Sequence, residues 1–322
     1  MKRLILVILA TAALTVSEAA PKKIKDSRIT VAVYNVTSSK TRAKDVEKGK
    51  APQQRLWTSC VDAVAAQLVE TDCDVVGLVE VCDSIAGKVG HSGLPDALDA
   101  RNSGYSWLAL SNTRPSLPYE GAYNKTQAIL WKTDKYDCLD HGINWLGGYF
   151  DKNRIQGELK GDATKSVTWA RFREKSTGKE FYFMVASTNG ASNEELSRVN
   201  CENLLKIAEE IIVTDGAPSI IVGSFNMQDN APAYTECLAY ARWTDVYARL
   251  KDDLLLPSDE LSNRDTRNNA KGEKPSGGRP DYVLADGFDM ESYHVVREKF
   301  PAADGSPVYP AYGFPVVVGL KY

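Results

Sequence analysis

Short apolar runs and helix-like repeats alternate along the chain, which is typical of an α/β protein. The segment 28–36 is dense in β-branched residues and 74–81 is almost entirely apolar, so both are predicted strands. Between them an apolar residue recurs at every fourth position, which predicts an amphipathic helix. The order strand, helix, strand returns over 180–223. Further strands are predicted at 127–132, 166–172, 281–284, 292–297 and 315–321.

Strand number and turn chemistry decide the fold class. The strands are too numerous for a simple parallel wound sheet, and Ser176-Thr177-Gly178-Lys179 is a predicted hairpin turn. We therefore expect an α/β (α+β) fold in which two mixed sheets pack face to face with helices outside. The range 25–322 contains no linker-like stretch and is predicted to be one domain. Its polar segment 251–280 is predicted to be a long surface loop.

The first residues have the pattern of a secretory signal. Lys2 and Arg3 precede an apolar run from 4 to 16, and small residues at 17 and 19 suit cleavage after Ala19. The run is shorter than a membrane-spanning helix needs, which favours a cleaved signal over a membrane anchor. We expect a signal peptide of about residues 1–20 to be removed, the mature protein to be secreted or periplasmic, and no transmembrane segment to remain.

Composition narrows the choice of partner. Of 322 residues, 43% are hydrophobic and 25% charged, as in ordinary globular proteins, and the formal net charge is −3. Because there is no basic excess, general binding to DNA or RNA gains no support. The spacing of the six cysteines matches no metal-binding motif. Disulfide bonds and buried free thiols are both compatible with the sequence.

Four polar residues stand at the ends of predicted core strands. Glu80 lies among apolar neighbours, and a buried carboxylate is costly unless it is paired, protonated or bound to a cation. Asn35 and Asn226 end or follow buried strands, and Asp281 begins another. If the four converge at one sheet edge, their oxygens suit a hard cation such as Mg²⁺. The alternative is that each only caps its own strand.

Six segments, in order, resemble the motifs of the endonuclease/exonuclease/phosphatase (deoxyribonuclease-I-like) family. They are ITVAVYNV, DCDVVGLVEV, SVTWARFREKSTGKEFYFMVAST, SIIVGSFNMQDNAPAY, RPDYVLADGF and YPAYGFPVVVGL. The resemblance covers about 28–322 and looks closest to the secreted bacterial members. It implies a four-layer α/β sandwich and metal-dependent phosphoester hydrolysis, in which an activated water attacks phosphorus.

The resemblance also implies roles for single residues. Glu80 corresponds to the metal-binding glutamate, and Asn35 to the asparagine that supports the metal site. Asn226 corresponds to the asparagine that contacts phosphate or water, and Asp281 to the aspartate that orients a catalytic histidine. Lys165 stands where the family usually has an arginine that contacts the phosphate. A lysine keeps the positive charge of that arginine but lacks its bidentate pair of N–H donors.

Several motif positions depart from the family. Ser187, or alternatively Thr188, stands where a histidine belongs, and Ser224 replaces the aspartate that positions or deprotonates the water. Tyr312 replaces an aspartate, and Gly313 replaces the catalytic histidine. A positioned acid or base contributes roughly 10²–10⁴ in rate. Neither serine nor glycine accepts a proton near neutral pH, so the resemblance implies catalytic degeneracy.

The remaining chemistry does not compensate for these losses. The chain has only three histidines, at 91, 141 and 294, and none lies in a motif. Asp281 loses its histidine and needs another donor, for which Arg279 is the candidate. Because two aspartates are missing, we expect Mg²⁺ or another divalent cation to bind weakly to Glu80 and Asn35.

Three functions stay open. The first is a degenerate protein that binds a phosphorylated or polyhydroxylated small molecule, or a protein partner, without turnover. The second is a metal-dependent phosphoesterase with a rearranged centre, in which Tyr123, Lys125, Lys165 or Tyr312 stabilises the transition state and Asp229 replaces the missing aspartate. The third is an interaction protein whose former cleft is filled by Tyr312.

Overall fold

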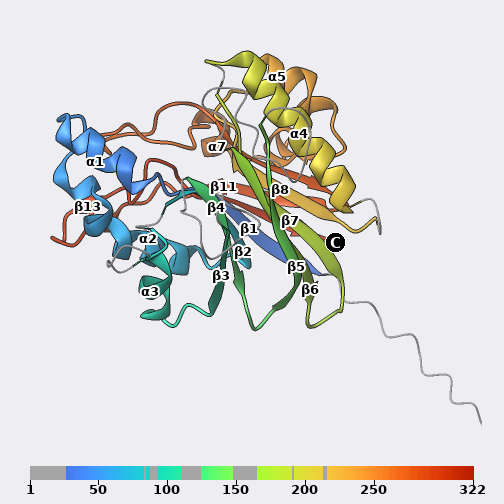
Figure 1. The fold of residues 1–322 in the computed structure, drawn as a ribbon, viewed down its shortest axis with the longest axis horizontal. Coiled ribbons are helices and arrows are strands. Elements are labelled where there is room, and N and C mark those ends of the chain that lie inside the picture. Colours follow the sequence, from blue (N-terminus) through green and yellow to red (C-terminus); the bar gives the residue numbers. More distant parts are fainter. Residues whose placement is uncertain are drawn as a thin grey trace, which may run out of the picture.

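The computed structural model describes residues 27–82, 85–87, 93–110, 125–147, 165–190, 192–212 and 216–322. Within these residues two six-stranded mixed sheets form the centre of the molecule (Figure 1). The first sheet has the order β11 (Asp289–Val295), β14 (Val316–Lys321), β1 (Arg28–Asn35), β2 (Val75–Val81), β4 (Thr126–Lys132) and β3 (Tyr105–Ala109). The second has the order β5 (Tyr136–Trp145), β6 (Ser166–Glu174), β7 (Glu180–Ser187), β8 (Ser219–Ser224), β10 (Asp281–Asp286) and β9 (Thr244–Asp245). A small separate pair consists of β12 (Phe300–Pro301) and β13 (Pro307–Val308).

Helices cover both outer faces, which gives the four layers that the sequence predicted. The first sheet is covered by α2 (Trp57–Thr71) and α3 (Leu94–Asp99), and the second by α4 (Glu194–Ile212) and α5 (Pro232–Glu236) (Figure 1). The shorter helices are α1 (Ser39–Glu47), α6 (Val246–Asp252), α7 (Ser258–Ser262) and the 3-10 turns η1 (Gln53–Arg55) and η2 (Leu238–Tyr240). No helix in these described ranges is long and apolar enough to cross a membrane.

Alternation along the strands builds the core. In β1, Val31 and Val33 belong to the cluster between the sheets, whereas Ala32 and Tyr34 belong to the cluster under α2. A Cβ added at Gly77 of β2 would lie 2.5 Å from a methyl group of Val222 on the facing sheet, so a larger residue does not fit there without a shift. All six cysteines are free thiols.

The polar segment 251–280 is more than the surface loop that its composition predicts. It contains α7, and the side chains of Thr266, Asn268 and Arg279 are buried. Hydrogen bonds from the backbone of Phe314 to Thr266 O (2.8 Å) and from Asn268 N to Tyr312 O (2.9 Å) pin the segment to the end of the chain. This anchoring carries the intervening residue, Arg267, to the edge of the sheets.

Candidate functional site

The ends of four core strands meet at one edge of the two sheets, and their polar residues form what we term the strand-end site. β1 runs parallel to β2, and β7 parallel to β8, so their carboxyl ends lie together. Ser224 is paired with Ser187 on one side and with Asp281 on the other. Asn35 Nδ2 donates to Ser224 Oγ across the sheets at 3.1 Å. The predicted convergence of Asn35, Asp281 and their neighbours is therefore present.

Glu80 reaches this site because β2 contains an extra residue there. The register between β2 and β4 shifts between Leu78 and Val81, and Glu80 has a φ of +65°. Such a bulge redirects a side chain. Thr37, Lys125 and Asn226 nearby also have positive φ, and strained backbone of this kind gathers at functional sites.

Glu80 is held as a carboxylate by the protein itself. Its oxygens accept from Ser38 N (3.3 Å) and Asn35 Nδ2 (3.4 Å), and Lys125 Nζ lies 3.4 Å from Oε2. Burial alone would raise the pKa of Glu80. The charges of Lys125 and Arg267 and these hydrogen bonds outweigh burial and lower the pKa below its ordinary value.

Arg267 occupies the centre of the strand-end site, and sequence reasoning missed it. Its Nη2 donates to Ser224 Oγ at 2.5 Å and to Asn226 Oδ1 at 2.9 Å. Nη2 and Nε each lie 3.4 Å from an oxygen of Asp281. One guanidinium thus contacts the three motif positions 224, 226 and 281, and only 27% of its side chain is exposed.

The partners of Asp281 correct one prediction. Asp281 is buried and accepts from Thr266 Oγ1 at 2.7 Å, from Ser224 Oγ and from Arg267. Arg279, the predicted donor, instead forms a fork with Asp245 at 2.8 and 3.0 Å, between the rings of Tyr247 and Tyr282. The position left by the histidine partner is therefore taken by an arginine from a distant segment.

The replaced motif positions offer no proton acceptor. Ser187 is buried and its Oγ is 3.4 Å from Lys165 Nζ. A Cβ at Gly313 would lie 2.6 Å from the carbonyl oxygen of Asn35, so a larger residue does not fit without a backbone shift. Burial raises the pKa of Tyr312 to about 12, which keeps its phenol neutral.

Tyr312 does not fill the site in the manner of the third hypothesis. Its ring lies against the guanidinium of Arg55, 4.5 Å from the ring centroid. Among the described residues, Glu80, Asn226 and Asp281 form their hydrogen bonds without it. The centre is filled by Arg267 instead.

Two buried arginines lie directly behind the strand-end site. Arg42 donates to the carbonyls of Thr37 (3.0 Å), Val36, Arg55 and Pro310 (2.8 Å). Arg55 donates to those of Tyr309 and Ala311 (3.2 Å) and to Asn268 Oδ1 (2.9 Å). In the described part of the chain neither guanidinium forms an ion pair with a carboxylate. Burial, together with the charge of Arg42, lowers the pKa of Arg55 to about 10, so Arg55 stays charged at neutral pH.

The donor set of the strand-end site does not fit the divalent cation that the family resemblance implies. Asn35 turns its amide N–H groups toward Glu80 and Ser224, because its Oδ1 accepts from Thr37 N at 2.9 Å. Glu80 and Asp281 are already paired with Lys125 and Arg267. A cation would have to displace two positive charges and reverse an amide.

Other predicted residues lie elsewhere. Tyr123 and His91 fall outside the described residues. Asp229 pairs with Arg264 at 2.9 Å and lies 3.7 Å from Arg279. His141 is an exposed residue of β5.

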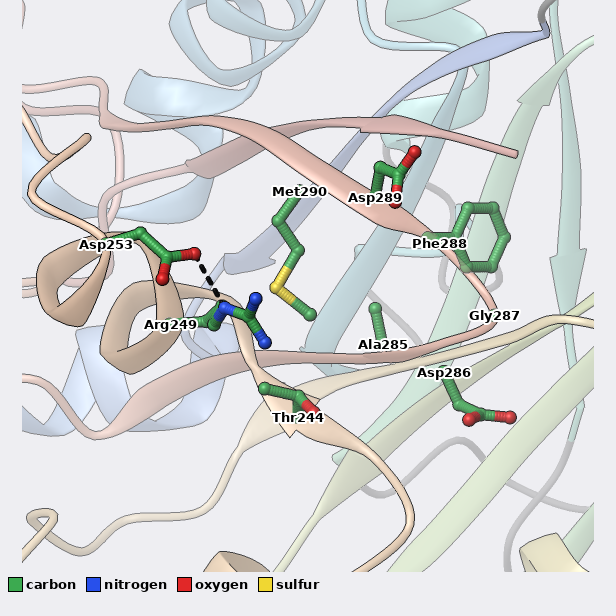
Figure 2. A pocket seen from close by; sticks show the side chains of 9 residues that line it. All are labelled: Thr244, Arg249, Asp253, Ala285, Asp286, Gly287, Phe288, Asp289 and Met290. Atoms are coloured by element: carbon green, nitrogen blue, oxygen red, sulfur yellow. Dashed lines mark hydrogen bonds and ion pairs between the residues drawn. The ribbon is translucent and has the colours of Figure 1, made fainter.

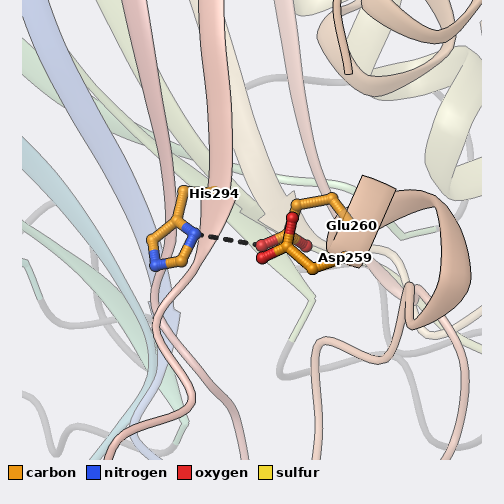
Figure 3. A group of neighbouring side chains, drawn as sticks. All are labelled: Asp259, Glu260 and His294. Atoms are coloured by element: carbon orange, nitrogen blue, oxygen red, sulfur yellow. Dashed lines mark ion pairs between the residues drawn. The ribbon is translucent and has the colours of Figure 1, made fainter. Parts of the chain in front are cut away.

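A group of potential metal ligands lies away from the strand-end site, at Asp259, Glu260 and His294 (Figure 3). Their ligand atoms lie within 4.8 Å of one another. The buried Glu260 is already satisfied, however, because its oxygens accept from Val295 N (2.9 Å), His294 Nδ1 (3.0 Å) and Arg297 (2.9 and 3.2 Å). Arg297 supplies the countercharge that a metal would bring.

A hollow of about 330 Å³ lies at the opposite end of β10 and does not belong to the strand-end site (Figure 2). It lies beside the hairpin from Ala285 to Met290, roughly 17 Å along an extended strand from Asp281. Its Arg249 is paired with Asp253 at 2.6 Å, and Asp286 with Arg242 at 2.5 Å. These are partly exposed ion pairs of the kind that surfaces commonly carry.

Fold and site together define a phosphoesterase scaffold, and comparison with known proteins identifies the family. A sequence model of the Endonuclease/Exonuclease/phosphatase family matches residues 46–307, so the chain belongs to this family. No curated protein matches the chain.

Solved structures agree on the fold. An endonuclease/exonuclease/phosphatase family protein from Bacteroides thetaiotaomicron is 18% identical with a TM-score of 0.71, over 92% of this chain and 99% of that one. The mannosyl-6-phosphatase of the same organism is 19% identical with a TM-score of 0.70, over 91% of this chain and 100% of that one. The human Nocturnin catalytic domain, solved with bound sulfate, is 14% identical with a TM-score of 0.60, over 92% of this chain and 97% of that one.

Proposed function

We propose that this chain is an exported member of the family that binds an anionic ligand without hydrolysing it. The ligand is a phosphorylated, polyhydroxylated small molecule, and the strand-end site binds it with protein cations in place of a metal. The observation that carries the proposal is the contact of Arg267 with Ser224, Asn226 and Asp281.

Charge supports an anion over a cation at this site. Glu80 and Asp281 carry two negative charges, and Lys125 and Arg267 balance them by direct contact. The buried guanidiniums of Arg42 and Arg55 add positive potential from behind, unopposed by any ion pair in the described residues. A positive potential of this kind raises the local concentration of oppositely charged ligands.

The absence of proton-transfer groups supports binding without turnover. Ser187 and Gly313 offer no base, and Asp281 is enclosed by Thr266, Ser224 and Arg267. Glu80, the other carboxylate of the site, is engaged by Lys125, Ser38 and Asn35. A rearranged active site would have to replace a rate enhancement of roughly 10²–10⁴ for each acid or base that is lacking.

Two relatives support the choice of ligand. One is described as a mannosyl-6-phosphatase, and another was solved with a bound sulfate anion. An arginine charge attracts phosphate and sulfate alike, and amides and hydroxyls of the kind that surround Arg267 also bind sugars.

The test uses mature protein, residues 20–322, with inorganic phosphate, mannose 6-phosphate and free mannose in titration calorimetry. We expect phosphate and mannose 6-phosphate to bind equally well in EDTA and in Mg²⁺, free mannose not to bind, and Arg267→Ala to weaken binding at least tenfold. Arg264→Ala, which removes an exposed arginine paired with Asp229, is the matched control and should bind normally.

The competing function is a metal-dependent phosphoesterase with a rearranged centre. The same protein is assayed with Mg²⁺ or Mn²⁺ on bis-p-nitrophenyl phosphate and mannose 6-phosphate, and we expect no turnover. Metal-dependent hydrolysis that Glu80→Ala abolishes would overturn the proposal and establish the alternative.

Export is tested separately. Expressed from its own start in a bacterial host, the protein should be recovered from the periplasm, with a mass that corresponds to cleavage after Ala19. Recovery of the uncleaved chain from the cytoplasm would contradict the signal-peptide part of the proposal.

A further inference from the structure

A second anchor holds the segment that carries Arg267, and it lies away from the strand-end site. It consists of Glu260 on α7 and Arg297, two residues beyond the end of β11, and we term it the α7 clasp. The guanidinium of Arg297 contacts both oxygens of Glu260, with Nη1 3.2 Å from Oε1 and Nη2 2.9 Å from Oε2. Glu260 is fully buried and only 16% of the Arg297 side chain is exposed, so the clasp is an interior ion pair, which is costly to break.

The clasp is fixed to the first sheet by β11. Oε1 of Glu260 accepts a hydrogen bond from the backbone of Val295 at 2.9 Å and lies 3.0 Å from Nδ1 of His294. Figure 3 shows the Glu260 side chain reaching from α7 toward His294. Because β11 is a strand of the first sheet, α7 is tied to that sheet through this carboxylate.

The guanidinium of Arg297 also holds the backbone that leads to Arg267. Its Nε donates to the carbonyl of Asp265 at 3.3 Å, and its Nη2 donates to the carbonyl of Asn263. Within the described residues, the side-chain hydrogen bonds of Arg297 all go to residues 260–265 and none goes to the strand-end site. One side chain therefore holds both α7 and the three residues that follow it.

Arg267 lies two residues beyond this backbone. Asp265 is followed directly by Thr266, whose Oγ1 donates to Asp281 at 2.7 Å. Arg267 comes next, and its Nη2 donates to two motif residues at 2.5 and 2.9 Å. A displacement of about 1 Å would carry these contacts beyond the usual hydrogen-bond range of about 2.7–3.2 Å. The contacts of Arg267 therefore depend on where residues 263–265 are held.

We propose that Arg297 is a positioning residue for the strand-end site. By holding residues 263–265 it sets the guanidinium of Arg267 where the anion binds, and it does not contact the ligand itself. Arg267 is thus fixed from two directions, because the end of the chain pairs with Thr266 and Asn268 and the clasp holds the residues before them. The effect on ligand binding rests on the proposed function, whereas the effect on the segment does not.

The test compares Arg297→Lys with the wild type in calorimetric titrations of the mature protein with inorganic phosphate in EDTA. Lysine keeps a positive charge beside Glu260, so the variant should fold, but one ammonium group cannot hold the carboxylate and both carbonyls at once. We expect phosphate binding to weaken at least about threefold. Arg28→Lys is the matched control, because Arg28 forms an exposed pair with Glu291 at the other end of β11, 2.8 Å apart, and this variant should bind normally.

A double-variant cycle separates positioning from a general loss of stability. Because Arg297 acts through Arg267, the variant Arg267→Ala/Arg297→Lys should bind phosphate no more weakly than Arg267→Ala alone. If the two losses of affinity multiply instead, Arg297 affects binding independently and the inference is overturned. It is equally overturned if Arg297→Lys binds phosphate as the wild type does.

Hydrogen exchange gives a readout that needs no ligand. The backbone amides of Thr266 and Asn268 are bonded to the carbonyls of Gly278 and Tyr312, each at 2.9 Å. In Arg297→Lys they should exchange at least about tenfold faster than in the wild type, and in the control variant they should not. Faster exchange confined to α7 would mean that the clasp supports only that helix, which overturns the inference. If the wild type does not bind phosphate, the proposed function fails, and the exchange of these two amides alone decides the inference.

Discussion

Replacing Arg267 by alanine separates the structural role of this residue from its role as a resident cation. The substitution removes bonds of 2.5 Å to Ser224 and 2.9 Å to Asn226, and two longer contacts to Asp281. Hydrogen bonds to charged groups contribute about 1.5–3 kcal/mol, but the side chain is 27% exposed and solvent screens part of this. Asp281 also keeps its two hydroxyl donors. We therefore expect a loss of about 1–3 kcal/mol in the free energy of unfolding.

The same variant should gain affinity for divalent cations. Without Arg267, the carboxylates of Glu80 and Asp281 at one sheet edge are balanced only by Lys125. If the resulting site binds Mn²⁺ with a dissociation constant of roughly 1 mM, then 10 mM Mn²⁺ stabilises it by about 1.4 kcal/mol. That corresponds to a rise in melting temperature of about 2–4 °C for a chain of this size.

The assay is thermal unfolding of wild type, Arg267→Ala and Arg264→Ala with EDTA or 10 mM Mn²⁺. Arg264 is 46% exposed, so its removal should lower stability by less than about 1 kcal/mol and create no response to Mn²⁺. The reasoning is refuted if wild type gains as much stability from Mn²⁺ as Arg267→Ala does, because the arginine would then not occupy the cation position.

Three further outcomes are expected. Burial alone would raise the pKa of Glu174, but bonds from four hydroxyl groups lower it below the ordinary 4.5. The stability that Glu174 confers is therefore present above about pH 4.5 and is lost as the pH falls through the pKa of Glu174 in the folded protein. In urea unfolding, the difference in free energy of unfolding between wild type and Glu174→Gln should therefore shrink below about pH 4.5. Gly313→His should lower the melting temperature without creating hydrolysis, because a Cβ there lies 2.6 Å from Asn35 O. Phe183→Ala, in the core between the sheets, should lower the free energy of unfolding by about 3–5 kcal/mol, whereas Leu254→Ala, 91% exposed, should leave it unchanged.

Much of the fold was predictable because each strand carries its own signal. The alternation in β1 separates the face toward the second sheet from the face toward α2, and the apolar run of β2 indicates a strand covered on both sides. The strand-end convergence follows from parallel pairing, since the register that joins β7 to β8 also brings Ser187 beside Ser224. The local hydrophobic pattern of the strands and the topology of the sheets therefore indicate the same fold.

Arg267 was not predictable, because nothing local distinguishes it. It stands in a polar segment without periodicity, and its place depends on contacts between Thr266 and Phe314 and between Asn268 and Tyr312, more than forty residues apart in sequence. Arg279 was the obvious donor for Asp281, two residues away. It precedes the strand, where the rule that alternate residues share a face does not hold, and its side chain pairs with Asp245.

The electrostatics of the strand-end site connect the two parts of our proposal, the loss of catalytic groups and the gain of a binding role. A metal-dependent centre needs surplus negative charge to retain its cation, whereas here each carboxylate has its own basic partner and two further guanidiniums lie buried behind them. If aspartates stood at 224 and 312, as the family resemblance implies for its active members, Arg267 would compete with the metal that they help to hold. Without those aspartates, Arg267 supplies the positive charge that the metal would bring, and on our proposal the site then favours an anion.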